Sequence, residues 1–498
     1  MNHLIQYRNL SYLLAPWVSR APQCPLREMQ IDSRSIVLGD LFVAINGHLT
    51  DGRYFISDAI AHGAAAVITE TKEKENHGKI DNINGVPVIH LINLPQFLSE
   101  IAGRFYQSPG KKLQIIGVTG TNGKTTTTHL LAQWVHLLGN LSGVIGTLGN
   151  GLYGQLLLTK NTTDSAVDVQ RTLASLLNQG VNLVGIEVSS HALTQYRVAD
   201  IPFAAAVFTN LSHDHLDYHG NMIHYEHSKW TLFSQHQVRH MIINNDDAIG
   251  SKWLKLLPNA VLVTTTNGGI PPSQKWLQAT KIIYHDSGTS VSFNSSWGYG
   301  QFDTQLIGSF NINNLFLSLA TLLSLEYPLD VLLYTAQKLT PISGRMQIFT
   351  GLNTPKIVVD YAHTPDALEK VLIILRYHCK GKLWCVFGCG GDRDKSKRPL
   401  MGKISEQLAD ISIITSDNPR NEDPRMIIND ILSGLLTPGS AYVVIDRAQA
   451  INYAIKKAEL DDIVLIAGKG SETYQIFGTQ NFSYSDSNLV LHLLRKLG

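Results

Sequence analysis

The chain has 498 residues, and at roughly 150 residues per domain this length predicts about three domains. Hydrophobic residues make up 44% of the chain and charged residues 16%, which provides for packed cores and excludes a largely disordered protein. Lysine and arginine (41) nearly balance aspartate and glutamate (40), so the net charge of +1 argues against a nucleic-acid partner and an anionic membrane.

Four cysteines are too few for a disulfide framework, and Cys385 and Cys389 lack the CxxC spacing of a zinc site. We expect buried, reduced thiols at Cys24, Cys379, Cys385 and Cys389. The sequence contains no apolar window of about 18 residues, the length that a membrane-spanning helix needs. The apolar run after Arg8 is too short and too broken for a signal peptide. These features predict a cytoplasmic protein with no membrane insertion.

The first 110 residues mix short apolar runs with turns, and residues 107–112 combine chain-breaking residues with charge, as a linker does. A β-rich run at 113–118 precedes a glycine-rich turn and a helical pattern at 125–138. Further β-rich runs alternate with helical intervals, which predicts a mostly parallel sheet covered on both faces. These runs lie at 181–188, 204–211, 240–245 and 260–265.

The pattern starts again after residue 345, with a predicted helix at 366–378. The β-rich runs around it predict a second α/β domain of the Rossmann type; they lie at 356–361, 383–388, 411–416, 441–446 and 462–468. We therefore predict an α/β protein with three domains, at residues 1–110, 111–342 and 343–498.

The segment Gly120-Thr121-Asn122-Gly123-Lys124-Thr125 lies between the first of these strands and its helix. Glycines allow backbone N–H groups to approach phosphate oxygens, and the helix N-terminus adds its positive dipole. Lys124 can reach the β- and γ-phosphates, and Thr125 can bind Mg²⁺. The leading glycine of the general pattern is replaced by Val118. A chance glycine-rich turn is the alternative, but the strand–loop–helix context favours nucleotide binding.

Glu187 lies near the carboxyl end of the run at 181–188, at the sheet edge where open α/β sheets bind ligands. A solvated structural carboxylate is one interpretation, and a Mg²⁺ ligand beside the phosphate loop is the one we favour. The segment 209–220 then crowds three histidines and two aspartates into seven residues, which is costly to bury without ligands; they are His213, Asp214, His215, Asp217 and His219. Their spacing matches no common zinc site. Lys229 follows, and taken alone it is a helix lysine able to pair with Glu226.

Several motifs occur together in one order: GTNGKTTT, EVSSHAL, TNLSHDHLDYHG, GSFNINN, SGRMQ, DYAHTPDAL, GDRDKSKRPLM and DNPR. The chain thereby resembles the Mur ligases. Its DSR and GDLFVAINGHLTDGRYF segments resemble the UDP-N-acetylmuramoyl-tripeptide synthetase branch of that family, so the resemblance covers essentially the whole chain. It implies an N-terminal α/β domain that holds the UDP end of a substrate, a central P-loop ATPase and a C-terminal Rossmann-like domain that brings an amino acid.

The resemblance also implies a reaction. ATP phosphorylates the γ-carboxylate of D-glutamate in UDP-N-acetylmuramoyl-L-Ala-D-Glu, and the amine of an amino acid attacks the acyl phosphate, releasing ADP and phosphate. Mg²⁺ is the implied cofactor, ATP the co-substrate and a monomer the implied working unit. The implied place of the reaction is cytoplasmic synthesis of peptidoglycan precursors.

Family positions carry over to this chain residue by residue. The ATP set is Gly120, Thr121, Asn122, Gly123, Lys124, Thr125, Thr126, Asn311, Arg345 and Asp360, with Arg345 a clamp on the transferring phosphoryl group. The Mg²⁺ ligands are Thr125, Glu187, His215 and Lys229, the last as an N6-carboxylysine carbamate. The UDP-substrate set is Ile31, Ser33, His48, Leu49, Thr50, Asn161, Thr162, Thr163, Ser189, Gln195 and Arg197. The amino-acid set is Arg393, Asp417, Asn418, Pro419, Arg420, Gly468 and Glu472.

Residues 417–420, DNPR, could be an ordinary turn, but that interpretation leaves Arg420 without a task. In the family this motif marks enzymes that add meso-diaminopimelate, whose second carboxylate a guanidinium can bind through two hydrogen bonds. One departure from the family is Ser471, which stands where relatives have histidine.

Three alternatives compete with this interpretation. Folylpolyglutamate synthase shares the ATPase core and the acyl-phosphate chemistry, but it lacks the DNPR motif and the N-terminal segments. A nucleotide-binding regulator without catalysis is disfavoured by the intact Lys124, Glu187, His215 and Lys229. A plain NTPase or kinase is the third alternative.

Overall fold

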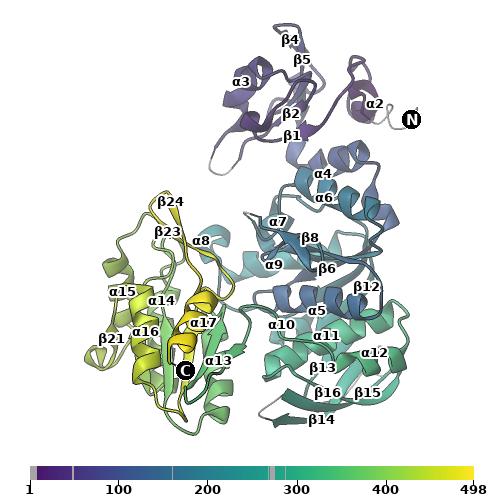
Figure 1. Cartoon of the computed structure of the whole chain (residues 1–498). Coiled ribbons are helices and arrows are strands. Elements are labelled where there is room, and N and C mark those ends of the chain that lie inside the picture. Colours follow the sequence, from purple (N-terminus) through teal and green to yellow (C-terminus); the bar gives the residue numbers. More distant parts are fainter. Residues whose placement is uncertain are drawn as a thin grey trace. The chain divides into compact units, whose positions relative to one another are not determined.

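The computed structural model describes residues 8–47, 50–159, 161–266, 268–269, 275–285 and 288–497. Figure 1 shows the helices and strands of the chain in the order of the sequence. The chain divides into two compact units. Unit one comprises residues 1–119, 139–206 and 228–241, and unit two comprises residues 120–138, 207–227 and 242–498. Both units combine helices and strands, which confirms the predicted α/β class.

Unit one begins with a five-stranded sheet of order β1-β2-β3-β5-β4. Only β4 is antiparallel to its neighbour. The strands are β1 (Met29–Gln30), β2 (Leu41–Ala44), β3 (Ala66–Thr71), β4 (Ile80–Ile83) and β5 (Val86–Ile92), and the helices are α2 (Leu10–Leu14), α3 (Ile56–Ala61) and α4 (Leu94–Phe105). Leu41 and Val43 join one buried cluster, and Phe42 joins another on the opposite face. Apolar residues therefore alternate into two cores, as in a sheet covered on both sides.

An eleven-stranded sheet has the order β16-β15-β14-β13-β12-β11-β6-β10-β7-β8-β9. Unit one contains β6 (Gln114–Thr119), β7 (Ser142–Gly146), β8 (Gly149–Leu152), β9 (Gln155–Leu157) and β10 (Leu183–Glu187), together with α6 (Ala166–Asn178) and α7 (Ser190–Thr194). The division between the units runs through β11 (Phe203–Phe208), β12 (Val238–Asn244) and α9 (Met222–Ser234). In unit one β10 pairs in parallel with β6 and β7, as the sequence predicts, and β8 and β9 extend that edge antiparallel.

Unit two holds the remaining strands of this sheet, β13 (Val261–Thr264), β14 (Trp276–His285), β15 (Gly288–Ser295) and β16 (Gly298–Thr304). β13 is parallel to β12 and β14, whereas β15 and β16 are antiparallel. The helices here are α5 (Lys124–Leu137), α8 (Leu216–His219), α10 (Ala248–Leu254), α11 (Ser309–Ser324) and α12 (Leu329–Ala336). Trp134 of α5 is fully buried and donates to Thr335 of α12 at 2.9 Å, which ties these helices together.

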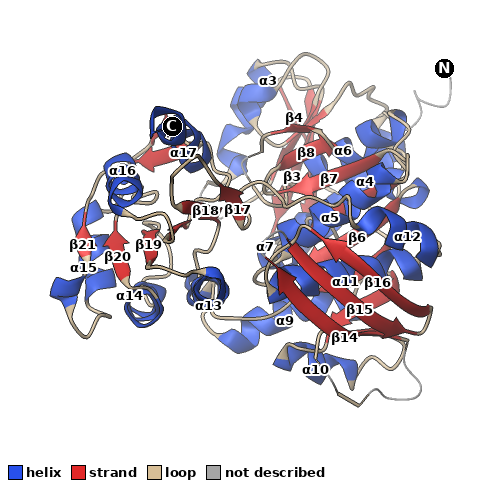
Figure 2. Cartoon of the chain, turned by 60° about the horizontal axis from the view of Figure 1, so that its bottom comes forward, coloured by secondary structure: helices blue, strands red, loops and turns tan. Residues whose placement is uncertain are grey.

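The C-terminal part of unit two has a six-stranded sheet of order β17-β18-β22-β19-β20-β21. All its pairs are parallel except β17–β18. The strands are β17 (Gln347–Phe349), β18 (Lys356–Asp360), β19 (Leu383–Phe387), β20 (Ile411–Ile414), β21 (Tyr442–Val443) and β22 (Ile463–Ala467). Helices α13 (Pro365–His378), α14 (Lys397–Leu408) and α15 (Pro424–Leu432) pack on one face. Helices α16 (Arg447–Lys457) and α17 (Asp486–Leu497) cover the other (Figure 2). A hairpin of β23 (Tyr474–Phe477) and β24 (Gln480–Ser483) stands apart from this sheet.

Within the segment 107–112, residues 109–112 form a 3₁₀ turn in which Pro109 and Gly110 are buried, and a Cβ on Gly110 would lie 3.3 Å from the ring of Pro202. The expectation that all four thiols are buried needs correction. Cys385 and Cys389 are buried, but Cys24 and Cys379 are only partly buried because both lie in connecting segments; all four thiols are free.

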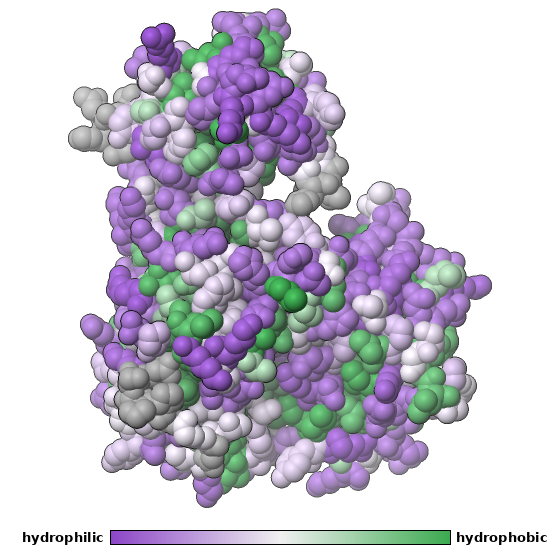
Figure 3. Space-filling view, turned by 180° about the vertical axis from the view of Figure 1, so that it is seen from behind, coloured by the Kyte–Doolittle hydropathy of each residue, from purple (hydrophilic) through white to green (hydrophobic). Residues whose placement is uncertain are grey.

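Among the helices of the described ranges, none is long and apolar enough to cross a membrane. On the face drawn in Figure 3, hydrophobic side chains are interspersed with polar ones.

Candidate active site

The phosphate loop connects β6 to α5, as the sequence predicts, and its glycines are required by close contacts. Gly123 has φ +85°, and a Cβ there would lie 2.5 Å from Oδ1 of Asn314. Gly120 has φ +149°, and a Cβ there would collide with the hydroxyl of Thr209. Any larger residue would displace the loop, so both positions need glycine.

The loop is fastened to the segment that follows β11. The backbone N–H of Thr121 donates to the carbonyl of Asn210 at 2.8 Å, and the N–H of Asn122 donates to Oδ1 of Asn210 at 3.0 Å. In return, the hydroxyl of Thr209 donates to the carbonyl of Asn122 at 2.6 Å. These bonds hold the loop in shape before any ligand arrives.

Two cations lie at this loop. Nζ of Lys124 donates to the carbonyls of Gly120 and Thr121 at 2.9 and 2.8 Å. Nη2 of Arg345 donates to the hydroxyl of Thr125 at 3.3 Å, and its guanidinium lies 4.2 Å from the ring centroid of Tyr361. A phosphate is a stronger acceptor than these neutral oxygens, so both cations can turn to an anion with little movement.

Two further residues of the predicted ATP set, Asp360 and Asn311, differ in their hydrogen-bond partners. Asp360 is buried and accepts hydrogen bonds from the N–H groups of Met346 and Ala362 at 2.7 and 2.8 Å. Burial raises the pKa of Asp360, and Arg345 opposes that rise. Asp360 therefore shapes the chain around Arg345. Asn311 donates to the carbonyl of Ile307 at 2.9 Å, while its own Oδ1 is buried without a hydrogen bond.

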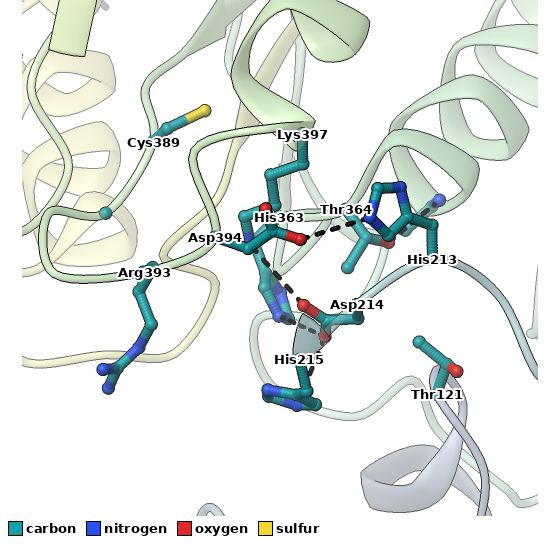
Figure 4. Close-up of polar contacts among 12 residues, drawn as sticks. Thr121, His213, Asp214, His215, His363, Thr364, Cys389, Arg393, Asp394 and Lys397 are labelled. Atoms are coloured by element: carbon teal, nitrogen blue, oxygen red, sulfur yellow. Dashed lines mark hydrogen bonds and ion pairs between the residues drawn. The ribbon is translucent and has the colours of Figure 1, made fainter. Parts of the chain in front are cut away.

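Asp214 is the buried centre of a cluster of titratable groups (Figure 4). Its carboxylate lies 3.3 Å from Nε2 of His215, 3.7 Å from Nζ of Lys397 and 3.9 Å from Nε2 of His363. Burial would raise the pKa of Asp214, but His215, Lys397 and His363, when protonated, lower it below its usual range. Burial lowers the pKa of His363 to about 4, so this imidazole is neutral at pH 7. The cluster thus joins the segment after β11 to α14 and to the turn after β18.

A second contact runs beside this cluster. Nε2 of His213 lies 3.2 Å from the carboxylate of Asp394, and the same imidazole is 3.4 Å from the hydroxyl of Ser396. In Figure 4 Arg393 points away from the Asp214 cluster. The sequence motifs contained these residues, but only the fold brings them together.

In unit one, Glu187 lies at the end of β10 and is fully buried. Its carboxylate accepts the N–H of Thr147 at 2.8 Å and the hydroxyl of Thr147 at 3.1 Å. Gly146 lies beside it, where a Cβ would collide with the carboxylate. Thr147 was not anticipated from the sequence, because its hydroxyl gains this partner only through the pairing of β7 with β10.

Five residues of the predicted UDP-substrate set lie around Glu187. The hydroxyl of Thr163 donates to the carbonyl of Glu187 at 2.6 Å. The hydroxyl oxygens of Thr163 and Ser189 lie 3.3 Å apart. Arg197 donates to the carbonyl of Thr163 at 2.5 Å and to Oε1 of Gln195 at 2.6 and 3.0 Å. Thr162 meets the hydroxyl of Thr147 at 3.1 Å.

The remaining residues of the predicted UDP-substrate set do not belong to this group around Glu187. Ser33 is buried in a 3₁₀ turn capped by Asp32, with Ile31 partly buried before it. Thr50 and Asn161 are exposed. His48 and Leu49 lie outside the described residues.

The predicted metal ligands stay a prediction. Lys229 lies in α9 and is 1% exposed, while Glu226 accepts hydrogen bonds from Lys252 and Trp253 at 2.7 and 3.2 Å. Over the described ranges, no three or more His, Cys, Asp or Glu side chains are grouped as a metal site.

The predicted amino-acid set forms a connected group in unit two. Glu472 accepts hydrogen bonds from Nδ2 of Asn418 at 2.9 Å and from Nζ of Lys469 at 2.7 Å. Lys469 is fully buried and also donates to Oδ1 of Asn418 at 2.9 Å. Burial and then the nearby Asp417 carboxylate raise the pKa of Glu472, whereas Lys469 lowers it. Lys469 was missed from the sequence, although it stands inside the Gly468–Glu472 run.

Arg393 and Arg420 meet at Gly390. A Cβ on Gly390 would lie 2.9 Å from Nη1 of Arg420 and 3.6 Å from Cγ of Arg393. Arg420 has φ +52° and donates to the carbonyl of Gly391 at 2.7 Å. Burial lowers the pKa of Arg420, and Arg393 lowers it further. Across the described part of the chain neither guanidinium forms an ion pair with a carboxylate, so each is available to bind an anion.

Three family models match successive parts of the chain. They are "Mur ligase family, catalytic domain" at residues 25–106, "Mur ligase middle domain" at 118–322 and "Mur ligase, glutamate ligase domain" at 344–470.

Solved structures with related folds extend over most of the chain. A UDP-N-acetylmuramoyl-L-alanyl-D-glutamate–2,6-diaminopimelate ligase is 33% identical, with 98% of this chain and 99% of that chain covered and a TM-score of 0.68. MurF ligase from Thermotoga maritima in complex with ADP is 18% identical, with 95% and 99% covered and a TM-score of 0.62. Folylpolyglutamate synthase from Mycobacterium tuberculosis is 16% identical, with 75% and 92% covered and a TM-score of 0.62. The last two show a shared fold.

Proposed function

This chain belongs to the Mur ligase family, and we propose that it adds meso-2,6-diaminopimelate to UDP-N-acetylmuramoyl-L-Ala-D-Glu in an ATP-dependent reaction. The new amide bond joins an amino group of diaminopimelate to the γ-carboxylate of D-glutamate. The product is a UDP-linked tripeptide for peptidoglycan synthesis. We further propose that a single chain is the working unit and that the reaction takes place in the cytoplasm, where ATP is available.

The observation that carries this proposal is the pair Arg393 and Arg420. Two arginines that both border Gly390 and form no ion pair with a carboxylate of the described residues suit an amino acid that has a second carboxylate. L-Lysine has no such group, and it would leave Arg420 partly buried and unpaired. The relative at 33% identity has diaminopimelate in its name, which supports the same choice.

The other residues of the proposed amino-acid site carry acceptor oxygens. Asp417, Asn418 and Glu472 lie together through the contacts of Lys469 and Gly468. Their oxygens can accept hydrogen bonds from the ammonium groups of diaminopimelate, while the arginines bind its carboxylates. The site thus matches both charges of its proposed ligand.

The phosphoryl transfer is assigned to unit-two residues that border the phosphate loop. The γ-carboxylate of D-glutamate attacks the γ-phosphorus of ATP, and ADP leaves. Lys124 and Arg345 neutralise charge on the transferring group. We assign Gly120, Thr121, Asn122, Gly123 and Thr126 to the phosphates. The amine of diaminopimelate then attacks the acyl carbon and loses a proton, and phosphate leaves.

The ATP assignment has support beyond the loop. The glycine positions hold the chain open where a Cβ would collide, which leaves backbone N–H groups accessible to phosphate oxygens. Asn311 offers a buried amide oxygen without a hydrogen bond, which suits an amino group such as that of adenine.

For Mg²⁺ the family resemblance supplies Thr125, Glu187, His215 and Lys229 as its carbamate. Carboxylate and hydroxyl oxygens are the ligands this ion prefers. When bound, the ion would neutralise the phosphate charges. Asp214 would orient the His215 imidazole, which it contacts at 3.3 Å.

The test is phosphate release measured with a panel of amino acids, in the presence and absence of UDP-N-acetylmuramoyl-L-Ala-D-Glu. We expect release only when ATP, this substrate and diaminopimelate are all present, with L-lysine disfavoured by ~10⁴ in kcat/KM. Release with a folate and glutamate would instead support a folylpolyglutamate synthase. Release without any second substrate would support a plain NTPase.

Arg420→Ala is the matched variant. It should reduce kcat/KM for diaminopimelate severely, because a charge-assisted hydrogen bond contributes roughly 1.5–3 kcal/mol, and leave kcat/KM for L-lysine nearly unchanged. Arg425→Ala, an exposed arginine at the start of α15, is the control. Equal kcat/KM for the two amino acids in the unmodified enzyme would contradict the assignment of diaminopimelate.

A further inference from the structure

Tyr361 follows β18 and lies directly beneath Arg345. The guanidinium carbon of Arg345 is 4.2 Å from the centroid of the Tyr361 ring, the geometry of a cation–π contact. The ring also contacts His363, whose ring centroid is 4.5 Å away at an interplanar angle of 63°. The tyrosine ring therefore contacts a residue of its own segment and supports Arg345.

The loop 468–472 of the amino-acid site closes on the same two side chains. A Cβ at Gly470, which has φ +53°, would lie 2.8 Å from Cβ of Tyr361 and 3.0 Å from Nη1 of Arg345. A Cβ at Gly344, just before Arg345, would collide with the backbone N–H of Ser471. Both approaches are possible only with glycine. This close packing connects the arginine of the phosphate side to the amino-acid side.

The electrostatic surroundings of Tyr361 point in the same direction. Burial raises the pKa of Tyr361, and the Glu472 carboxylate raises it further, while Arg345 lowers it. The hydroxyl therefore remains protonated at neutral pH. Tyr361 is influenced by Arg345 of the phosphate side and by Glu472 and Asp417 of the amino-acid side, so it lies between the two halves of the site.

We infer that Tyr361 is a positioning residue for the ligase reaction: its ring holds the Arg345 guanidinium in place beside Thr125 and couples that placement to the loop 468–472. The inference rests on the proposed function, in which Arg345 neutralises the transferring phosphoryl group. An arginine side chain has several rotatable bonds, and ordering it during the reaction costs conformational entropy. A ring that orders it beforehand reduces this cost and favours the transition state.

The experiment compares Tyr361→Phe, which keeps the ring, with Tyr361→Leu, which removes it. In the full chain we expect Tyr361→Leu to lower kcat ~10-fold or more, with smaller changes in KM for ATP and for diaminopimelate. Tyr361→Phe should stay within about threefold of the unmodified enzyme, because the cation–π contact needs the ring and not the hydroxyl. Tyr377→Leu, on an exposed tyrosine of α13, makes the same change away from the site.

A double-mutant cycle separates positioning from a general structural role. Because Tyr361 acts through Arg345, adding Tyr361→Leu to Arg345→Ala should slow the reaction no further. Tm is measured for every variant, and Tyr361→Met, which fills more of the ring's volume, replaces Tyr361→Leu if the latter does not fold. Additive losses, or a loss in Tyr361→Phe equal to that in Tyr361→Leu, would overturn the inference.

The unmodified enzyme distinguishes this failure from failure of the proposed function. If it releases phosphate only with both substrates and Arg345→Ala is impaired, an unimpaired Tyr361→Leu refutes the positioning role alone. If the unmodified enzyme shows no release that depends on both substrates, the proposed function fails, and the inference built on it fails too.

Discussion

Lys124 and Lys229 show how differently single lysines can be placed in this molecule. Lys124 is partly buried, at the start of α5, and its ammonium donates to two carbonyls of its own loop. Lys229 is almost wholly enclosed within α9. Removing a buried cation costs most where a charged partner depends on it. The two lysines therefore lead to separate predictions about activity.

Lys124→Ala should lower kcat/KM by orders of magnitude, because the transferring phosphates lose a cation, while the fold survives. Phosphate release and circular dichroism measure the two effects. Lys112→Ala, on an exposed lysine before β6, serves as the control. A folded Lys124→Ala enzyme with near-normal turnover would refute the nucleotide-site assignment.

Lys229→Ala should be nearly inactive, because the proposed carbamate converts a cation into an anionic ligand for Mg²⁺. A short carboxylic acid added to this variant should restore part of the activity by replacing the lost carboxylate. Mass spectrometry of the native protein, or a ¹³C-bicarbonate NMR signal, tests the carbamate directly. An unmodified ammonium in the active, metal- and ATP-loaded enzyme would disprove it.

At the scale of elements, the phosphate loop depends on two neighbours that lie far away in the sequence. Gly123 leaves room for Asn314 of α11, and Gly120 leaves room for Thr209 after β11. The loop is thus shaped by packing against these side chains as well as by its own backbone. This double constraint makes its glycines more sensitive to substitution than glycines in open turns.

Gly123→Ala should abolish ATP binding, because a Cβ there would lie 2.5 Å from Asn314 in addition to the strain of a left-handed backbone. Gly139→Ala provides the matched comparison, since its φ is +81° and nothing lies within 4 Å of its Cβ position. We expect Gly139→Ala to lose only about 1 kcal/mol of stability and to bind ATP normally. Calorimetric ATP titration of the two variants measures the difference, and equal affinities would contradict the steric argument.

At the scale of the whole molecule, buried imidazoles connect stability to pH. Burial lowers the pKa of His236 to about 4, and burial followed by the charge of Arg345 lowers the pKa of His129 to about 4. An unfolded chain takes up these protons near pH 6.5, earlier than the folded protein does. The contribution of these imidazoles to the free energy of unfolding is therefore largest above about pH 6.5, and it decreases as the pH falls towards 4.

Urea denaturation between pH 7.5 and 4 should show this decrease, of at most roughly 3 kcal/mol for each imidazole. His236→Leu should flatten the pH dependence, because the proton uptake of the unfolded state then has one contributor fewer. His62→Leu, at an exposed position after α3, controls for the substitution itself. A pH profile unchanged by His236→Leu would refute this origin.

Local patterns in the sequence were sufficient for the α/β class, the strand–loop–helix around Lys124 and the mostly parallel pairing around β6 and β10. These features depend on hydrophobic periodicity and on turn chemistry, which neighbouring residues determine. Even there the exact ends of the elements differ from the prediction: β21 spans only Tyr442–Val443 of a predicted 441–446. The three domain boundaries stay a prediction.

Only the tertiary structure brought Asp214 together with Lys397 and His363, Thr147 with Glu187, and Tyr361 with Arg345. Such pairs form between segments that meet through sheet order and helix packing, so no local spacing encodes them. The sequence placed Arg393 and Arg420 in one set through resemblance, but their meeting at Gly390 depends on a left-handed turn and on a close backbone approach. Residue types determine which chemistry is available, whereas long-range packing determines which groups share it.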